Sequence, residues 1–454
     1  MTSTLRRAGG FAAVGTLSLA APALGVAAAA PFAAVAVLAA FVITDGPVFE
    51  LFARPGDRED GRLNGLASFA LAATGLALLA TVPRVPMPVG VFVATVLVVT
   101  YGNLGAQLAT TRADGPFVSV AGFAALGFPA GIVGQVVVGL VAEPTAIAAT
   151  SLAALTAALP AFAFVAACVT LVAALVRSVL HERDDPVVVL SAGILAWVFD
   201  ALVVTVTPVE VGLAIVVTAA LGFASYALGT ASVTGMLTGV LLGLLTIVLG
   251  GFGWFVVLIA FFSVGGLSTK FRYDEKRARG VAEDNDGARG SSNVLGNAAV
   301  AFVAVVGFAA SIRLSAGPVI GTAFGFAFAG SVAAAMSDTL SSEIGGLYDR
   351  PRLITTLQPV APGTDGGVTW QGEVAGVVGA AFVAALALFF MPLSGPDEVV
   401  VGAVVLGGVA GMTVDSLLGA TLEGDHIGNE AVNLLATLTG AAVSGGVALA
   451  VLPS

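Results

Sequence analysis

Carboxylates interrupt apolar sequence at two places, where they could bind a divalent cation. Asp338 ends the apolar run AAAMS, and Glu343 follows five residues later. On a continuous helix these two side chains would lie about 140° apart, yet a bend at a membrane edge could turn both toward one ion. Asp415 interrupts a later apolar run. Because hard oxygen ligands suit Mg²⁺, the sequence predicts a magnesium site formed by Asp338, Glu343 and Asp415.

Two polar segments near these carboxylates have the composition of phosphate sites. Segment 269–293 ends in GARGSSN directly before an apolar helix, where free N–H groups, a positive dipole end and Arg289 would attract a phosphate. Segment 337–372 contains the glycine-rich turn GTDGG, which is not a Walker A sequence because no GK[ST] follows. The alternative interpretation of both segments is a solvated loop, which for 269–293 would also obey the positive-inside rule.

The amino-acid composition indicates that these polar segments belong to a membrane protein. Of 454 residues, 58% are hydrophobic and only 10% are charged, which argues against a soluble enzyme, a disordered scaffold and a nucleic-acid binder. Apolar runs long enough to span a bilayer recur throughout, so the fold class is all-α and polytopic, with roughly fifteen transmembrane helices. The predicted spans are 9–29, 31–51, 64–82, 87–108, 117–141, 145–176, 186–206, 210–229, 233–249, 252–268, 294–312, 318–336, 373–391, 397–417 and 430–451.

Basic residues orient these spans. With the N-terminus on the cytoplasmic side, sixteen of the eighteen Arg and Lys residues fall in cytoplasmic segments, and only Arg84 and Arg313 fall outside. A multi-pass protein of the cell membrane with cytoplasmic motif loops is therefore expected. One cysteine and two histidines make a disulfide, a zinc site or a Ser-His triad improbable. The net charge of −10 and the use of Arg over Lys are typical of a salt-loving archaeon.

Four sequence blocks resemble a known family. The blocks are RGVAEDNDGARGSSNVLGN, SDTLSSEIGG, LITTLQPVAPGTDGGVTWQG and DSLLGATLE with a following NEAVN. In order and spacing they resemble the membrane family called domain of unknown function 92, which includes transmembrane protein 19 and the plant phytyl-phosphate kinase of tocopherol synthesis. The resemblance covers about 210–454 and implies kinase activity on isoprenyl phosphates for the plant branch. A membrane domain at 208–454 is predicted accordingly.

Phosphoryl transfer to an isoprenyl monophosphate suits these residues, because such a phosphate is already ionised and needs no general base. We therefore expect a kinase that uses Mg²⁺ and either CTP or ATP, with the prenyl tail in the lipid bilayer. Its predicted catalytic residues are Lys270, Arg289, Asp338, Glu343 and Asp415. Its predicted cofactor-binding residues are Gly287, Gly290, Ser341, Ser342, Thr355, Thr356, Gly363, Thr364, Gly366, Gly367 and Asn429.

Other interpretations remain open at this point. A transporter or lipid flippase is the main alternative, and a lipid nucleotidyltransferase or a membrane scaffold are further ones. Residues 1–207 are either an added helical scaffold or a degenerate repeat. In the repeat interpretation TYGNLGAQLA at 100–109 aligns with MSDTLSSEIG at 336–345, so that Gly102 replaces Asp338 and Gln107 replaces Glu343.

Overall fold

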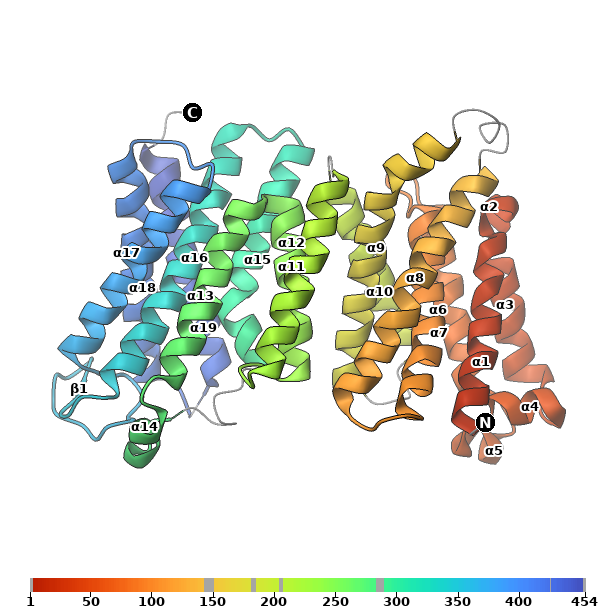
Figure 1. Cartoon of the computed structure of the whole chain (residues 1–454), viewed down its shortest axis with the longest axis horizontal. Coiled ribbons are helices and arrows are strands. Elements are labelled where there is room, and N and C mark those ends of the chain that lie inside the picture. The colour runs from red at the N-terminus through yellow and green to blue at the C-terminus, as the bar shows by residue number, and fades with distance from the viewer. Residues whose placement is uncertain are drawn as a thin grey trace. The chain divides into compact units, whose positions relative to one another are not determined.

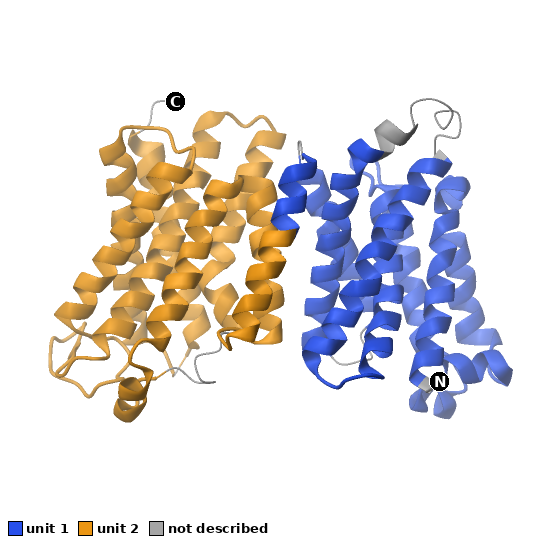
Figure 2. Ribbon diagram, viewed as in Figure 1, with its two compact units in different colours: residues 1–215 blue, residues 216–454 orange. Residues whose placement is uncertain are grey.

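The protein is an all-helical polytopic membrane protein with two compact units (Figures 1 and 2). The computed structural model describes residues 3–142, 151–180, 185–203, 207–282, 290–424 and 426–451. Unit 1 comprises residues 1–215 and unit 2 residues 216–454. The boundary lies within one helix, α11 (Pro208–Ala227).

Among the described residues, unit 1 contains ten α-helices before α11, two short 3-10 helices and one short π-helix. Their bounds are α1 Ser3–Gly15, η1 Thr16–Ala20, α2 Ala21–Leu24, η2 Gly25–Ala27, α3 Ala30–Val37, η3 Leu38–Val42, α4 Gly46–Phe52, α5 Pro55–Asp60, α6 Asn64–Leu79, α7 Val89–Thr110, α8 Pro116–Ala142, α9 Ser151–Val179 and α10 Asp185–Leu202. The predicted 145–176 span corresponds to α9, which continues through Pro160 as one helix.

Unit 2 adds eight helices and a small two-stranded sheet. Their bounds are α12 Val233–Gly250, α13 Phe252–Lys270, α14 Tyr273–Arg279, α15 Ser291–Arg313, α16 Pro318–Gly345, β1 Arg352–Leu353, β2 Gly367–Val368, α17 Trp370–Phe390, α18 Asp397–Gly419 and α19 Asn429–Val451. The strands are antiparallel, with Arg352 opposite Val368 and Leu353 opposite Gly367. Figure 1 shows α14 and β1 at the same end of this unit.

Thirteen helices in the described residues are long and apolar enough to cross a membrane, or fourteen if one bent pair is a span. The prediction of roughly fifteen included the same segments. The predicted 31–51 span is the bent pair, Ala30–Val42 and Gly46–Phe52, with an angle of 106° between its parts. The predicted 64–82 span is α6, which has only 16 residues and is shorter than a bilayer normally requires.

Helix α16 extends farther than the sequence suggested. Its 28 residues span about 42 Å, more than the roughly 30 Å core of a bilayer. The first residues of the predicted polar loop 337–372 therefore belong to a helix, and Asp338 and Glu343 lie on its last three turns. The predicted 269–293 loop also contains regular structure, because α13 reaches Lys270 and α14 follows at once.

Small residues allow α16 to occupy the centre of unit 2, where it contacts α15, α17, α18 and α19. A Cβ built on Gly411 of α18 would lie 2.3 Å from the Cβ of Ala334 in α16. A Cβ on Gly407 of α18 would lie 2.1 Å from the Ser444 hydroxyl oxygen and 2.6 Å from the Gly440 carbonyl oxygen, both in α19. These distances leave no room for a methyl group, so the helix backbones are in direct contact.

This packing predicts different effects for two glycines of α18. Gly407→Ala must push α18 away from α19, and we expect it to lower the free energy of unfolding by about 1–3 kcal/mol. Gly402→Ala is the matched control, because no atom lies within 4 Å of a Cβ at Gly402. The measurement is the thermal midpoint of each detergent-solubilised variant. Equal midpoints for the two variants would contradict the close approach of α18 and α19.

Candidate functional site

The predicted site residues gather at one end of unit 2. Helices α13, α16 and α18 finish at this end, whereas α15, α17 and α19 begin there. The last turns of α16 pack closely against the first turn of α17, since a Cβ on Gly372 would lie 2.6 Å from the Ser341 carbonyl oxygen. The first turns of α15 and α19 also pack together, since a Cβ on Gly296 would lie 3.1 Å from the Glu430 carbonyl oxygen. Chain segments from the end of α13 to the start of α19 therefore build one site.

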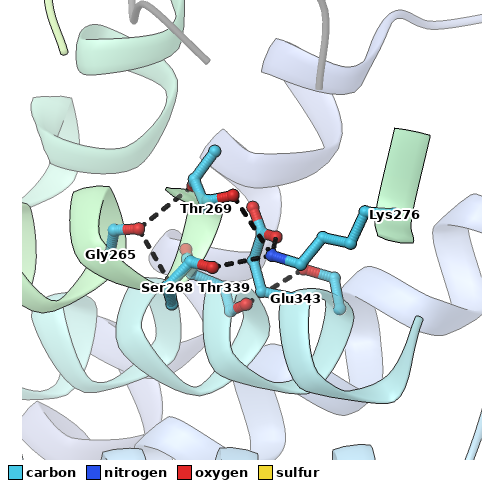
Figure 3. A network of polar contacts seen from close by, with 7 residues as sticks. Gly265, Ser268, Thr269, Lys276, Thr339 and Glu343 are labelled. Carbon is cyan, nitrogen blue, oxygen red and sulfur yellow. Dashed lines mark hydrogen bonds and ion pairs between the residues drawn. The ribbon is translucent and has the colours of Figure 1, made fainter. Parts of the chain in front are cut away.

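A buried ion pair joins α14 to the last turns of α16 (Figure 3). Lys276 is 1% exposed, and its Nζ lies 2.5 Å from Oε2 of Glu343, which is also buried. The same ammonium donates hydrogen bonds to the carbonyl oxygens of Ser268, at 2.7 Å, and Thr269, at 3.2 Å. These carbonyls end α13, where the helix dipole favours a cation. With three acceptors, Lys276 fixes α13, α14 and α16 to one another.

A second charged contact joins α16 to α18. The side chains of Asp338 and Asp415 lie within hydrogen-bonding reach of each other. Oδ2 of Asp415 is buried and has no hydrogen-bond partner among the described residues. The hydroxyl of Ser337, in the turn that carries Asp338, is likewise buried without a partner there. Two adjacent carboxylates cannot both remain ionised unless a cation lies between them, so this pair has the character of a cation or proton site.

Glu423, in the loop between α18 and α19, lies near Asp415 and two further acidic residues. Glu423 lies in this loop, outside the candidate membrane spans. Its pKa is raised above the usual range, first by burial and then by the nearby charges of Asp365, Asp415 and Glu430. The end of unit 2 therefore presents a concentration of negative charge that a cation would relieve.

The glycine-rich turn GTDGG, residues 363–367, packs against the end of α18. Gly363 and Gly366 have φ angles of 82° and 71°, which favour glycine. A Cβ on Gly366 would lie 2.6 Å from the Ser416 carbonyl oxygen, so the turn packs directly after Asp415. The amides of Thr364 and Gly367 donate to carbonyls of Ala361 and Thr364, and the Thr364 hydroxyl donates to Ala361 as well. These donors are used internally, which favours a positioning role over a phosphate cradle.

Asparagines mark the helices that begin at this end. In α15 the side-chain amide of Asn297 donates to the Asn293 carbonyl, and Oδ1 of Asn293 is buried without a partner among the described residues. In α19 Asn433 is buried, one turn after the exposed Asn429. The first turns of both helices present backbone N–H groups that have no acceptor within their own helix. A helix start of this kind is suited to an anion.

The structure separates the predicted residues into groups. It brings Asp338 and Asp415 together, and it places the following residues at the same end of unit 2: Gly290, Ser341, Ser342, Glu343, Thr355, Thr356, Gly363, Thr364, Gly366, Gly367 and Asn429. Thr355 and Thr356 are exposed in the turn after β1. Arg289 and Gly287 lie outside the described residues.

Two predicted roles differ from what the structure contains. Lys270 is exposed, and its Nζ donates to the Leu228 carbonyl after α11 at 3.0 Å, so it belongs to a helix end and not to the acidic cluster. The predicted metal trio does not form either. In the part of the chain that the structure describes, no three Asp, Glu, His or Cys side chains are close enough to hold a metal ion. Because α16 continues as a helix, Glu343 points away from Asp338 and pairs with Lys276.

Lys276 is the site residue that the sequence prediction missed. The positive-inside rule alone accounts for it as one of the basic residues of the 269–293 segment. The available signal was its rarity, since only two of the eighteen basic residues are lysine. Its partner Glu343 is 67 positions away, so local spacing could not reveal the pair.

The site lies within the residues that match a known protein family. Residues 216–441 match the family described as integral membrane protein DUF92. An uncharacterized membrane protein of Methanocaldococcus jannaschii is 35% identical over 212 residues, which cover 45% of this chain and 81% of that protein. The Arabidopsis thaliana protein named VTE6, chloroplastic, is 31% identical over 218 residues, or 47% of this chain and 64% of the relative.

Another Arabidopsis thaliana protein, named PGR, is 32% identical over 225 residues, which cover 46% of this chain and 78% of PGR. No solved structure matches the chain. The matched residues begin where unit 2 begins, and unit 1 lies outside the family match. Through unit 2, with its helical core and its acidic site, the chain belongs to the integral membrane protein DUF92 family.

Proposed function

We propose that unit 2 is a nucleotide-dependent kinase that phosphorylates an isoprenyl monophosphate. The observation that supports this proposal is the pair formed by Asp338 and Asp415 where two packed helices end. The family resemblance implies such a kinase in the plant branch, and a chloroplastic plant protein is among the relatives. The helix-rich unit would keep the prenyl tail in the bilayer while the phosphate reaches the polar end.

The residues present fit a magnesium ion, with fewer protein ligands than the sequence predicted. Asp338 and Asp415 would hold the ion, and the unsatisfied Oδ2 of Asp415 is an oxygen available to it. Mg²⁺ commonly takes one or two carboxylates and completes its octahedral shell with waters and substrate phosphates. Bound there, it would neutralise charge on the transferred phosphoryl group.

The chain's own residues would supply positioning and charge. An oxygen of the isoprenyl monophosphate attacks the terminal phosphorus of the nucleotide, and the bond from that phosphorus to its bridging oxygen breaks, which releases a nucleoside diphosphate. The first turns of α15 and α19 would orient the phosphates through backbone N–H groups. Arg289, just before α15, would add two parallel hydrogen bonds to phosphate oxygens. No residue is required as a general base.

The depth of the carboxylates favours an enzyme over a transporter. Asp415 precedes the end of α18 by four residues, about 6 Å, and Asp338 precedes the end of α16 by seven residues, about 10 Å. Transporters hold substrate and ions near the bilayer midplane. Both aspartates are nearer to one end of their helices, where a soluble nucleotide could reach them.

The central test replaces each of the two aspartates with asparagine, which has nearly the same shape but no charge. We expect Asp338→Asn and Asp415→Asn to lower phosphoryl transfer by about a hundredfold or more, since each removes a group that neutralises the transition state. The assay combines purified protein, labelled CTP or ATP, Mg²⁺ and a panel of prenyl alcohols and prenyl monophosphates. Asp397→Asn, at the opposite end of α18, is the matched control. Transfer that survives Asp415→Asn would refute the assignment.

A second prediction concerns Lys276 as a positioning residue. Lys276→Met leaves Glu343 buried without its cation, and we expect this to lower the free energy of unfolding by about 3–5 kcal/mol. The double variant Lys276→Met, Glu343→Leu removes both charges and should recover much of that loss. Lys270→Met, at an exposed lysine, is the control. Thermal midpoints of the purified variants decide the matter, and a double variant less stable than Lys276→Met would argue against the pair.

A third prediction follows from the raised pKa of Glu423. Glutamate in an unfolded chain titrates near pH 4.3, so folding disfavours the ionised form and Glu423 costs stability as the pH rises through its folded pKa. Glu423→Gln should therefore raise the thermal midpoint at pH 7 to 8, and this gain should vanish below about pH 4. Added Mg²⁺ should reduce the gain by relieving the repulsion.

The control for this measurement is Glu59→Gln, the same change at an exposed residue of α5 in unit 1. We expect its midpoint to follow the parent protein at every pH. A gain for Glu423→Gln that is equally large at pH 4 and pH 8 would point to packing instead of charge.

A further inference from the structure

Asn293, in the first turn of α15, has a side-chain oxygen that lacks a hydrogen-bond partner. This atom, Oδ1, is buried, and no donor reaches it among the described residues. Oδ2 of Asp415 in α18 is buried in the same unsatisfied state. A buried acceptor without a partner costs roughly 1–3 kcal/mol, so two of them at one end of unit 2 indicate a place for a ligand.

The packing of α15 against α16 places Asn293 level with Asp338. The two helices run in opposite directions, and a Cβ on Gly307 of α15 would meet the ring of Phe324 in α16. Asn293 precedes Gly307 by fourteen residues, and Asp338 follows Phe324 by fourteen residues. Fourteen residues are about four turns of an α-helix, with a rise of about 21 Å. Asn293 and Asp338 therefore lie at the same level, on the sides of the two helices that face each other.

Helix α18 brings Asp415 to this level as well. Helices α16 and α18 run in the same direction, and Gly411 of α18 packs against Ala334 of α16. Asp415 and Asp338 each follow these contact residues by four positions, which is about one turn. The contact between the two aspartates agrees with this register. Three helices thus contribute Asn293, Asp338 and Asp415 to one level of the bundle.

Helix α19 adds a buried amide beside them. Asn433 lies seven residues before Gly440, and a Cβ on Gly440 would lie 2.7 Å from the Cβ of Ala334 in α16. Seven residues are about two turns, so Asn433 is on the face of α19 that packs against α16. Its side chain is buried. Polar side chains therefore occupy facing positions of four helices at this end, and polar groups in such places within a membrane bundle are usually functional.

The chemistry of these groups favours a cation. An amide oxygen and ionised carboxylates are all acceptors, so they cannot satisfy one another. A cation would relieve every one of them, whereas an anion would add repulsion. Neutral amide oxygens are ordinary ligands of hard cations such as Mg²⁺ and Ca²⁺. Asn293 would thus take the position of third ligand that the sequence prediction gave to Glu343, which is paired with Lys276 instead.

We propose that Oδ1 of Asn293 is the third protein ligand of the cation held by Asp338 and Asp415. This inference rests on the cation site of the proposed function, but it does not depend on which group is transferred. Three protein oxygens would fill three of the six positions of an octahedral Mg²⁺ and leave three for phosphate oxygens and waters. A cation bound in this way would tie the start of α15 to the ends of α16 and α18.

The experiment measures cation binding by the full-length protein without nucleotide or prenyl substrate. The thermal midpoint in neutral detergent is titrated with magnesium chloride, against sodium chloride at matched ionic strength. We expect Mg²⁺ to stabilise the parent protein and Asp415→Asn to abolish this stabilisation. Asn293→Ala should weaken the affinity for Mg²⁺ about tenfold or more. Ser292→Ala, at the exposed neighbour in α15, should leave the affinity unchanged.

Asn293→Asp separates a metal ligand from a merely structural side chain. It retains an oxygen and adds a negative charge next to two carboxylates. We therefore expect a lower thermal midpoint without Mg²⁺ and a tighter affinity for Mg²⁺. An asparagine that only packs, or that donates to a phosphate, would show no such gain in affinity. This variant also decides the matter where Asn293→Ala does not fold.

The outcomes separate this inference from the proposed function. An affinity for Mg²⁺ that is the same in Asn293→Ala as in the parent protein would overturn the role of Asn293 and leave the site of Asp338 and Asp415 intact. An unchanged or weaker affinity in Asn293→Asp would overturn it in the same way. A parent protein that Mg²⁺ does not stabilise would refute the cation site itself, and with it the metal of the proposed kinase.

Discussion

The free-energy cost of removing a carboxylate from water determines how the charged side chains at the polar end of unit 2 are paired. In an apolar bundle each ionised side chain needs a cation, a proton or several hydrogen-bond donors. Glu343 has an internal cation, Lys276, which is itself satisfied by two carbonyls at the end of α13. Asp338 and Asp415 have each other, and an oxygen of Asp415 has no partner in the described part of the chain. One pair is complete within the protein, whereas the other is suited to an external cation.

This difference depends on helix geometry. Five residues along α16 separate Asp338 from Glu343, and the helix turns them to different neighbours, α18 and α14. The close approach of α16 and α18 requires Gly411, because a methyl group there would meet Ala334 of α16, and Gly407 likewise allows α18 to approach α19. Small residues in the apolar core thus set the separation of the carboxylates, and the ion pair of Lys276 sets the orientation of the turns beyond them.

Much of the fold could be predicted because apolar runs define membrane helices locally. The described residues contain thirteen or fourteen candidate spans against roughly fifteen predicted, and the difference lies where a run is bent, at 30–52, or short, at α6. The proximity of Asp338 and Asp415 was also anticipated, from their placement at the same end of predicted spans. Contacts between residues far apart in the sequence could not be predicted, and these contacts determine which side chains pair in the site. Lys276 pairs with a residue 67 positions away, and Lys270, the other lysine, turns to α11.

The carboxylates of unit 2 determine which ligand its polar end can hold. Unit 2 concentrates carboxylates around Asp415, and a cation is the simplest means of relieving them. An acidic site of this kind suits a metal that carries a nucleotide. In the proposed kinase, phosphoryl transfer would therefore take place at this end of unit 2.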